Sequence, residues 1–260
     1  MALAEHLREF RNRLFISLCA VGVGAVVGWI YYQDLLELLQ HPLDATIAQL
    51  EREGDVDIRA VINSVAGGFM LQVKVALTAG IVLASPIWLY QLWAFIMPGL
   101  HRRERKWTLI FVAIAGPLFA SGVMLGYYVL PKGLTVLLGF TPEDVSNLID
   151  VRDYLNFILR ILIVFGISFE LPLFVVMLNL AGVVRARQLA RWRSWIIFAT
   201  FVFAAVATPS TDPITMLLLA IPMMLLFLIS EQIARFVDRR RGLDAEPDYD
   251  KFDDEEASPL

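Results

Sequence analysis

Long runs of apolar residues without any charge constrain this chain more than any other feature. The run from Leu14 to Tyr32 is the clearest, and it closes with Trp29, Tyr31 and Tyr32. Such runs are typical of helices that cross a membrane, and aromatic residues suit the boundary between lipid and water. The composition agrees, because 58% of the residues are hydrophobic and only 18% are charged. We therefore expect an all-α polytopic membrane protein.

Six segments are apolar enough to cross the membrane, at about 14–32, 69–97, 108–130, 154–181, 195–208 and 214–229. The second would be roughly 43 Å long as a helix, more than a core of ~30 Å needs, and Pro86 predicts a kink in it. The last two, at roughly 21 and 24 Å, are short for a full crossing. Prolines lie in or at the ends of every span after the first. The sequence thus predicts a bent, concave bundle with a short final hairpin.

Lysine and arginine gather in segments that the apolar runs separate. All but six of the 22 lie in residues 1–13, 98–107, 182–193 and 235–260. Loops rich in these residues stay on the cytosolic side, so both termini are expected in the cytosol. No cleavable signal peptide or transit segment is evident, which favours a bacterial or archaeal plasma membrane. Residues 1–234 would form one membrane domain, and 235–260 a basic and then acidic disordered tail.

Nothing in the sequence indicates an enzyme. The one cysteine, Cys19, lies in an apolar run, and the three histidines show no metal-ligand spacing. The chain has no glycine-rich phosphate loop, no HExxH motif and no pairing of a nucleophile with a base. We therefore predict no catalysis, no cofactor, no metal and no nucleic-acid partner.

A short basic turn between the second and third spans carries one acid. Glu104 stands among four cations, namely Arg102, Arg103, Arg105 and Lys106. Taken alone, it is most simply a loop residue with local ion pairs that contribute little. The N-terminal segment repeats the arrangement, with Glu9 between Arg8 and Arg11 on an expected amphipathic surface helix. Two such acids at headgroup level could accept a guanidinium pair through bidentate hydrogen bonds.

Two further acids lie in or beside the spans. Glu170 is near the middle of the fourth span, where a carboxylate costs ~2.5–3.5 kcal/mol to insert. It either faces a cavity or partner, or is protonated and hydrogen-bonded within the bundle near a kink at Pro172. Asp212, in the turn of the final hairpin, is most simply a turn or helix-capping residue.

Six short motifs stand in the order and at the separations of a known family. They are HLREFRNRL at 6–14, SPIWLYQLWAFIMPGL at 85–100, HRRERK at 101–106, FGISFELP at 165–172, TPSTDP at 208–213 and LAIP at 219–222. On these motifs, over about residues 6–231, the chain resembles the TatC family, the receptor subunit of the twin-arginine protein translocase. The resemblance implies six helices in a cupped bundle whose cytosolic face binds the twin-arginine signal peptides of folded cargo proteins.

The resemblance also implies roles for particular residues. Glu104 and Glu9 would receive the arginine pair, and the neighbours in the site would be Phe95, Arg11, Arg103 and Arg105. Polar positions in the membrane or facing partners would be Glu170, Asp212 and Thr208. Pro42 resembles a structural proline of the first outer loop, where we expect it to separate two short helices.

The partners that the resemblance implies are the single-span proteins TatA and TatB, docked along the fifth and sixth spans, with self-association in a receptor complex. The proton motive force would drive export. The family often has a glutamine near the start of the last span, where this chain reads Thr215 and Met216. Two alternatives remain open: a proton-coupled small-solute transporter with Glu170 as its relay, and a purely structural subunit. No internal repeat supports the transporter.

Overall fold

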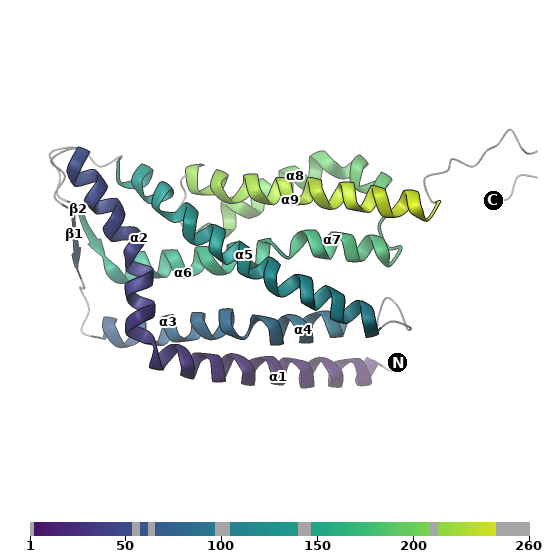
Figure 1. Ribbon diagram of the computed structural model, residues 1–260, viewed down its shortest axis with the longest axis horizontal. Helices are drawn as coiled ribbons and strands as arrows, with labels where there is room; N and C mark the ends of the chain where they lie inside the picture. Colours follow the sequence, from purple (N-terminus) through teal and green to yellow (C-terminus); the bar gives the residue numbers. More distant parts are fainter. Residues whose placement is uncertain are drawn as a thin grey trace, which may run out of the picture.

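Helices account for most of the chain (Figure 1). The structure is a computed structural model that describes residues 3–53, 58–61, 66–96, 105–139, 147–208 and 213–242. In chain order its elements are α1 (Leu3–Ile30), α2 (Tyr32–Glu53), β1 (Ile58–Val61), α3 (Gly67–Leu83), α4 (Ser85–Ile96), α5 (Arg105–Leu138), β2 (Asn147–Asp150), α6 (Val151–Ser168), α7 (Leu171–Leu180), α8 (Ala186–Ala207) and α9 (Pro213–Arg240). The all-α expectation holds for the described residues except β1 and β2, which pair in parallel with Ile58 opposite Asn147.

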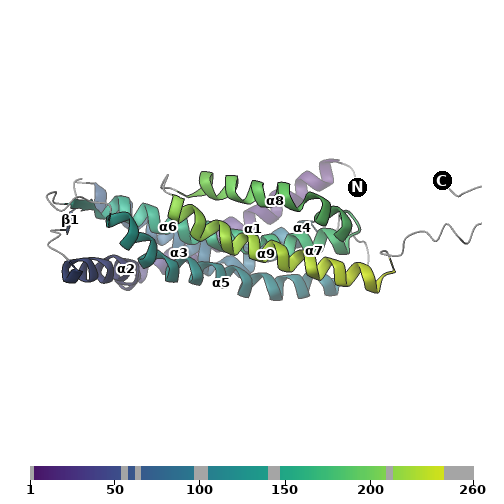
Figure 2. The same cartoon turned by 90° about the horizontal axis from the view of Figure 1, so that it is seen from above.

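Five or six segments of the structure can cross a membrane, in line with the six spans expected. Five helices are long and apolar enough to cross a membrane, and the bent pair α3–α4 makes the sixth. The start of α1 and the end of α9 lie at one end of the bundle, which we call the termini end, while β1 and β2 lie at the opposite, sheet end (Figure 1). Seen from above, α2 and α5 lie along one face of the bundle and α8 along the other (Figure 2).

The second span breaks where Pro86 predicts it. The axes of α3 and α4 differ by 57°, and Pro86 is the second residue of α4. Proline has no N–H and cannot donate to the carbonyl four residues earlier, so the helix cannot continue straight. Pro86 leaves the carbonyl of Val82 without that donor. One residue earlier, the indole Nε1 of Trp88 donates to the carbonyl of Ile81 at 2.9 Å. A side chain of α4 thus bonds across the break to the backbone of α3.

The prediction that Pro42 separates two short helices is wrong, because Pro42 lies inside the continuous helix α2. Its missing N–H leaves the carbonyl of Leu38 without the usual helical donor. The hydroxyl of Tyr127 on α5 donates to that carbonyl at 2.9 Å, and the hydroxyl of Tyr154 on α6 donates to the carbonyl of Leu39 at 2.7 Å. Tyr127 thus replaces the donor that Pro42 lacks, and Tyr154 adds a second bond from a neighbouring helix to α2.

The fourth span is interrupted between α6 and α7, close to the kink expected at Pro172. Phe169 and Glu170 separate the two helices, and Pro172 is the second residue of α7. A proline is well tolerated there, because the first N–H groups of a helix have no intrahelical partner.

The other helices extend beyond the predicted spans. Helix α5 continues past the predicted end of its span at residue 130, through Pro131 to Leu138. Helices α8 and α9 include basic residues at the termini end, and α9 runs past the predicted domain boundary at 234 to Arg240. At the other end, the α8–α9 hairpin stops short of the sheet end that α2 and α5 reach (Figure 1), as the short apolar segments predict.

Helix α1 joins the bundle along a seam of small residues. Gly24 and Gly28, four residues apart, are its buried positions against α3. A Cβ added to Gly80 of α3 would lie 2.6 Å from the carbonyl oxygen of Val21. Small residues at this spacing let two membrane helices approach closely, and van der Waals contact then holds them together. This seam fixes the position of the N-terminal helix beside α4.

Candidate functional site

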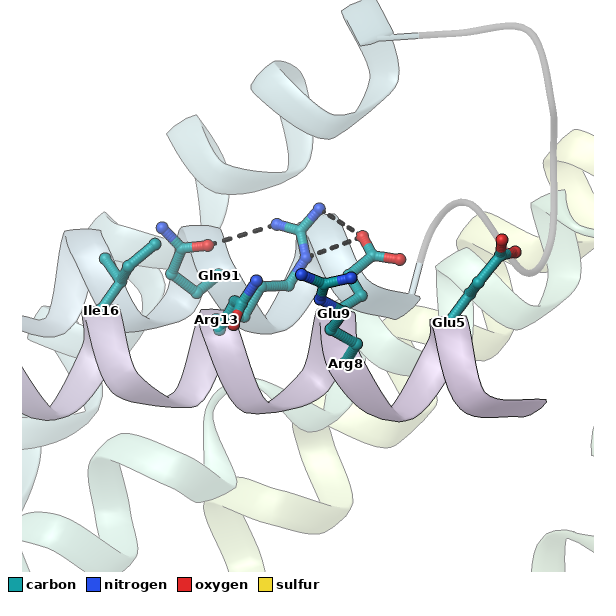
Figure 3. A pocket seen from close by; sticks show the side chains of 7 residues that line it. Glu5, Arg8, Glu9, Arg13, Ile16 and Gln91 are labelled. Atoms are coloured by element: carbon teal, nitrogen blue, oxygen red, sulfur yellow. Dashed lines mark hydrogen bonds and ion pairs between the residues drawn. The ribbon is translucent and has the colours of Figure 1, made fainter. Parts of the chain in front are cut away.

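A cluster of charged and polar side chains lies where α1 passes α4 at the termini end. Arg13 donates from Nε and Nη2 to Oε1 of Glu9, at 3.0 and 2.7 Å. Its Nη1 donates to Oε1 of Gln91, on α4, at 3.2 Å. Figure 3 shows the guanidinium of Arg13 between the two acceptors. Glu9 and Arg13 are one helical turn apart, which places both on the same face of α1.

This cluster lines an open pocket of about 420 Å³. Its wall is formed by Glu5, Arg8, Glu9, Asn12, Arg13, Ile16 and Gln91. The side chains of Arg13 and Glu9 are 24% and 28% exposed, so the ion pair is reachable from outside. A partly exposed pair of this kind contributes little to stability and can exchange partners at low cost.

An aromatic group adjoins the charged pocket. The ring of Phe95, near the end of α4, stacks on His6 of α1 with centroids 4.5 Å apart, and Phe10 lies 5.4 Å from it. A second pocket of about 270 Å³ runs between Phe10, Trp88 and Phe95, and it shares Arg13 and Gln91 with the first. Charged and apolar surfaces are therefore continuous at this end of the molecule.

The structure brings together two of the predicted binding residues, Glu9 and Phe95. Arg11 is exposed on α1, donates to Oδ1 of its neighbour Asn12 at 3.3 Å, and does not line the pocket. Arg103, Glu104 and Asp212 lie outside the described residues. Arg105 is the first residue of α5, and only its backbone is described.

Glu170 lies at the break between α6 and α7 with its carboxylate turned inward. Both carboxylate oxygens are buried, and the buried Nε1 of Trp93 is the polar group beside them. The rings of Phe111 and Phe174 pack on Trp93 at 5.9 and 6.4 Å.

The remaining predicted positions serve local structure. Thr208 directly follows α8 as its C-cap residue, is buried, and donates from Oγ1 to the carbonyl of Ala204 at 2.9 Å. Pro42 and Pro86 make the helix irregularities described above.

Sequence reasoning missed a buried charged group that joins α8 to α9. Glu231 is fully buried, and Arg193 donates to both its oxygens, from Nε at 2.9 Å and from Nη2 at 2.6 Å. Arg235 adds a third bond at 2.5 Å. The pairing of Glu231 with Arg235 has helical spacing and is visible in the sequence. The pairing with Arg193 spans 38 residues and is not.

A second missed group ties α7 to both of the last helices. Asp238 is buried, and it accepts from Nδ2 of Asn179 at 2.9 Å and from the backbone N–H of Ala186 at 2.6 Å. Ala186 is the first residue of α8, so the carboxylate of Asp238 satisfies a free N–H at a positive helix end. Within the described part of the chain, no group of three or more His, Cys, Asp or Glu residues could hold a metal ion.

The fold and the site together define a class of protein. It is a polytopic helical membrane protein with a charged, partly apolar surface at one end. The model of the family described as Sec-independent protein translocase protein (TatC) matches residues 5–222. The chain belongs to this family. It is a non-enzymatic membrane component of protein translocation, and the resemblance read from the six motifs is confirmed.

Curated relatives carry the same name, Sec-independent protein translocase protein TatC. The relative from Frankia casuarinae is 43% identical over 266 residues, which is all of this chain and 73% of that protein. The relative from Xylanimonas cellulosilytica is 40% identical over 92% of this chain and 86% of its own length. A crystal structure of the twin-arginine translocase receptor TatC in DDM is 33% identical and superposes with a TM-score of 0.77, over 88% of this chain and 99% of that chain.

Proposed function

We propose that this chain binds twin-arginine signal peptides of folded proteins with the surface around Glu9, on the cytosolic side of the membrane. The observation that carries the proposal is the contact of Glu9 with Arg13, because the pocket already holds a guanidinium on this carboxylate. The related crystal structures are of a twin-arginine translocase receptor, which supports the same reading.

The geometry suggests an exchange of arginines. Nη1 of Arg13 already contacts Gln91, so Arg13 can release Glu9 and keep an acceptor on α4. A guanidinium from the peptide would then take both oxygens of Glu9. The planar fork of arginine fits a carboxylate through two parallel bonds, whereas the ammonium of lysine cannot make this pair. Recognition of arginine over lysine follows from that difference.

The second acid of the proposed site is Glu104, with Arg103 and Arg105 beside it and Arg11 on α1 as a further neighbour. This assignment rests on the family resemblance. It is supported by the described ends of the flanking helices, since the end of α4 and the start of α5 both lie at the termini end (Figure 1). Two acids would receive two arginines, and Phe95 would contact the apolar part of the peptide.

Export needs further components in this proposal. TatA and TatB, single-span membrane proteins, would dock along α8 and α9, where Asp212 and Thr208 stand at the hairpin. Glu170 would be the polar group inside the membrane, and the proton motive force the energy source. The termini end would face the cytosol of a bacterium or archaeon, as the lysine and arginine distribution favours.

Crosslinking of a labelled twin-arginine peptide to the full-length chain in membranes tests the proposal. Glu9→Gln and Glu104→Ala should each reduce crosslinking at least tenfold, about 1.4 kcal/mol of binding free energy. A twin-lysine peptide should crosslink to the parent chain at least tenfold less than the twin-arginine peptide does.

Glu37→Gln is the matched control, because it removes an exposed carboxylate from α2, far from the pocket. Undiminished crosslinking in the Glu104→Ala variant would remove Glu104 from the site. Equal binding of the twin-lysine peptide would reject the bidentate mode of recognition.

A further inference from the structure

Two cations stand on an open face of the bundle near the sheet end, opposite the pocket of Glu9. Lys74 on α3 and Arg160 on α6 are both exposed. Nζ of Lys74 donates to Oδ1 of Asn156 at 2.8 Å, and Arg160 follows Asn156 by one turn of α6. Residues one turn apart have Cβ atoms about 6 Å from each other, so one small anion can reach both cations.

The positive charge of this pair is not compensated within its own helices. Helix α3 contains no acid, and the acid of α6 is Asp153. Asp153 is two turns from Arg160, about 10 Å along the axis, and its carboxylate lies 3.9 Å from Nε of Arg152. The guanidinium of Arg160 makes no hydrogen bond or ion pair with any residue that the structure describes. A cation inside an apolar helix usually has a partner, so one is missing here.

The depth of the pair indicates where that partner lies. The span α6–α7 covers 30 residues, or about 45 Å of helix against a hydrocarbon core of ~30 Å, which leaves roughly 7 Å at each end among the headgroups. Arg160 is nine residues into α6, about 13 Å from its start. Its side chain points back toward the start of the helix and spans about 6 Å, which brings the guanidinium to the edge of the headgroup layer.

Lys74 reaches the same level. It is seven residues into α3, about 10 Å from the start of that helix, and α3 also begins at the sheet end (Figure 1). Both long side chains therefore snorkel toward one leaflet, and they do so side by side, because Asn156 of α6 holds the ammonium.

We propose that Lys74 and Arg160 bind the phosphate of an anionic phospholipid in the leaflet at the sheet end. Arginine offers two parallel N–H donors to phosphate oxygens and lysine adds a compact charge. Asn156 is a positioning residue that keeps the ammonium next to the guanidinium. The lipid is favoured over the carboxylate of another membrane helix because phosphates already occupy the level at which both cations end.

Native mass spectrometry of the full-length chain, titrated with phosphatidylglycerol in detergent, tests this site. Arg160→Gln and Lys74→Gln should each weaken binding about fivefold, the factor expected for one cation near a lipid surface. Asn156→Ala should weaken it by a smaller factor, and phosphatidylcholine should bind more weakly than phosphatidylglycerol to the parent chain.

Lys132→Gln is the matched control. Lys132 also lies near the sheet end, but on α5, where its ammonium sits 5.6 Å from the ring of Tyr128. An equal loss of lipid in the Lys132→Gln variant, or equal binding of both lipids by the parent chain, would overturn the proposal. So would a lipid affinity that survives in both Arg160→Gln and Lys74→Gln. Each variant should still crosslink the twin-arginine peptide, which separates loss of lipid binding from loss of the fold. If Arg160→Gln does not fold, the lipid affinity of Lys74→Gln tests the proposal.

Discussion

At the scale of single residues, two glutamates show how burial sets the role of an ion pair. Glu9 is partly exposed and shares one arginine with a neighbouring glutamine, so its partner can be replaced. Glu231 is fully buried and accepts from two arginines, so its partners are fixed. A buried carboxylate must keep its donors, since it has no water to replace them.

We expect Glu231→Gln to lower the free energy of unfolding by about 2–3 kcal/mol, because two guanidinium groups lose their counter-charge and one of them its bidentate contact. The measurement is denaturant or thermal unfolding of the purified chain in detergent, followed by circular dichroism. Glu37→Gln, on the exposed face of α2, should change the same quantity by less than about 0.5 kcal/mol. A Glu231→Gln variant as stable as the parent would show that the group adds nothing net to the fold.

Individual contacts of the site were only partly accessible from the sequence. Glu9 and Phe95 were predicted as site residues from the family motifs at 6–14 and 85–100. The bond from Arg13 to Gln91 joins residues 78 positions apart and depends on how α1 lies against α4. That arrangement is decided by the glycine seam and by the 57° bend, which periodicity alone does not encode.

At the scale of elements, hydropathy located the spans well and the connections poorly. The apolar runs marked all six crossings, because burial in lipid demands long charge-free segments. The stretch 33–68 contains helix α2 and the strand β1, which pairs with β2 some ninety residues later. Pro42 favoured a break in the helix there, but α2 runs through it, and the hydroxyl of Tyr127 on α5 replaces the donor that the proline lacks.

The role of Tyr127 can be tested with a double-mutant cycle. Tyr127→Phe should destabilise the parent chain by about 0.5–1 kcal/mol, because the carbonyl of Leu38 loses its donor. In a Pro42→Ala background, residue 42 regains an N–H that satisfies this carbonyl, and Tyr127→Phe should then cost almost nothing. Unfolding free energies of the four chains give the coupling, and additive effects would show that the two features are independent.

At the scale of the whole molecule, the even number of spans places the start of α1 and the end of α9 at one end (Figure 1). Cysteine labelling determines which side of the membrane that end faces. In a Cys19→Ser background, Arg240→Cys should resist a membrane-impermeant maleimide in intact cells and react in inverted vesicles. Lys132→Cys, at the opposite end, should show the reverse. Labelling of both positions from outside would contradict the proposed orientation.

The groups around Glu231 and Asp238 hold the final hairpin more firmly at one end than at the other. They bind α8 and α9 to each other and to α7 at the termini end. The far end of the hairpin packs through apolar residues such as Ala204 and Leu219, whose contacts are non-directional. The hairpin is therefore held by directional bonds at the termini end and by non-directional apolar contacts further along, so a partner that docks on the far part would meet the less constrained end of the hairpin.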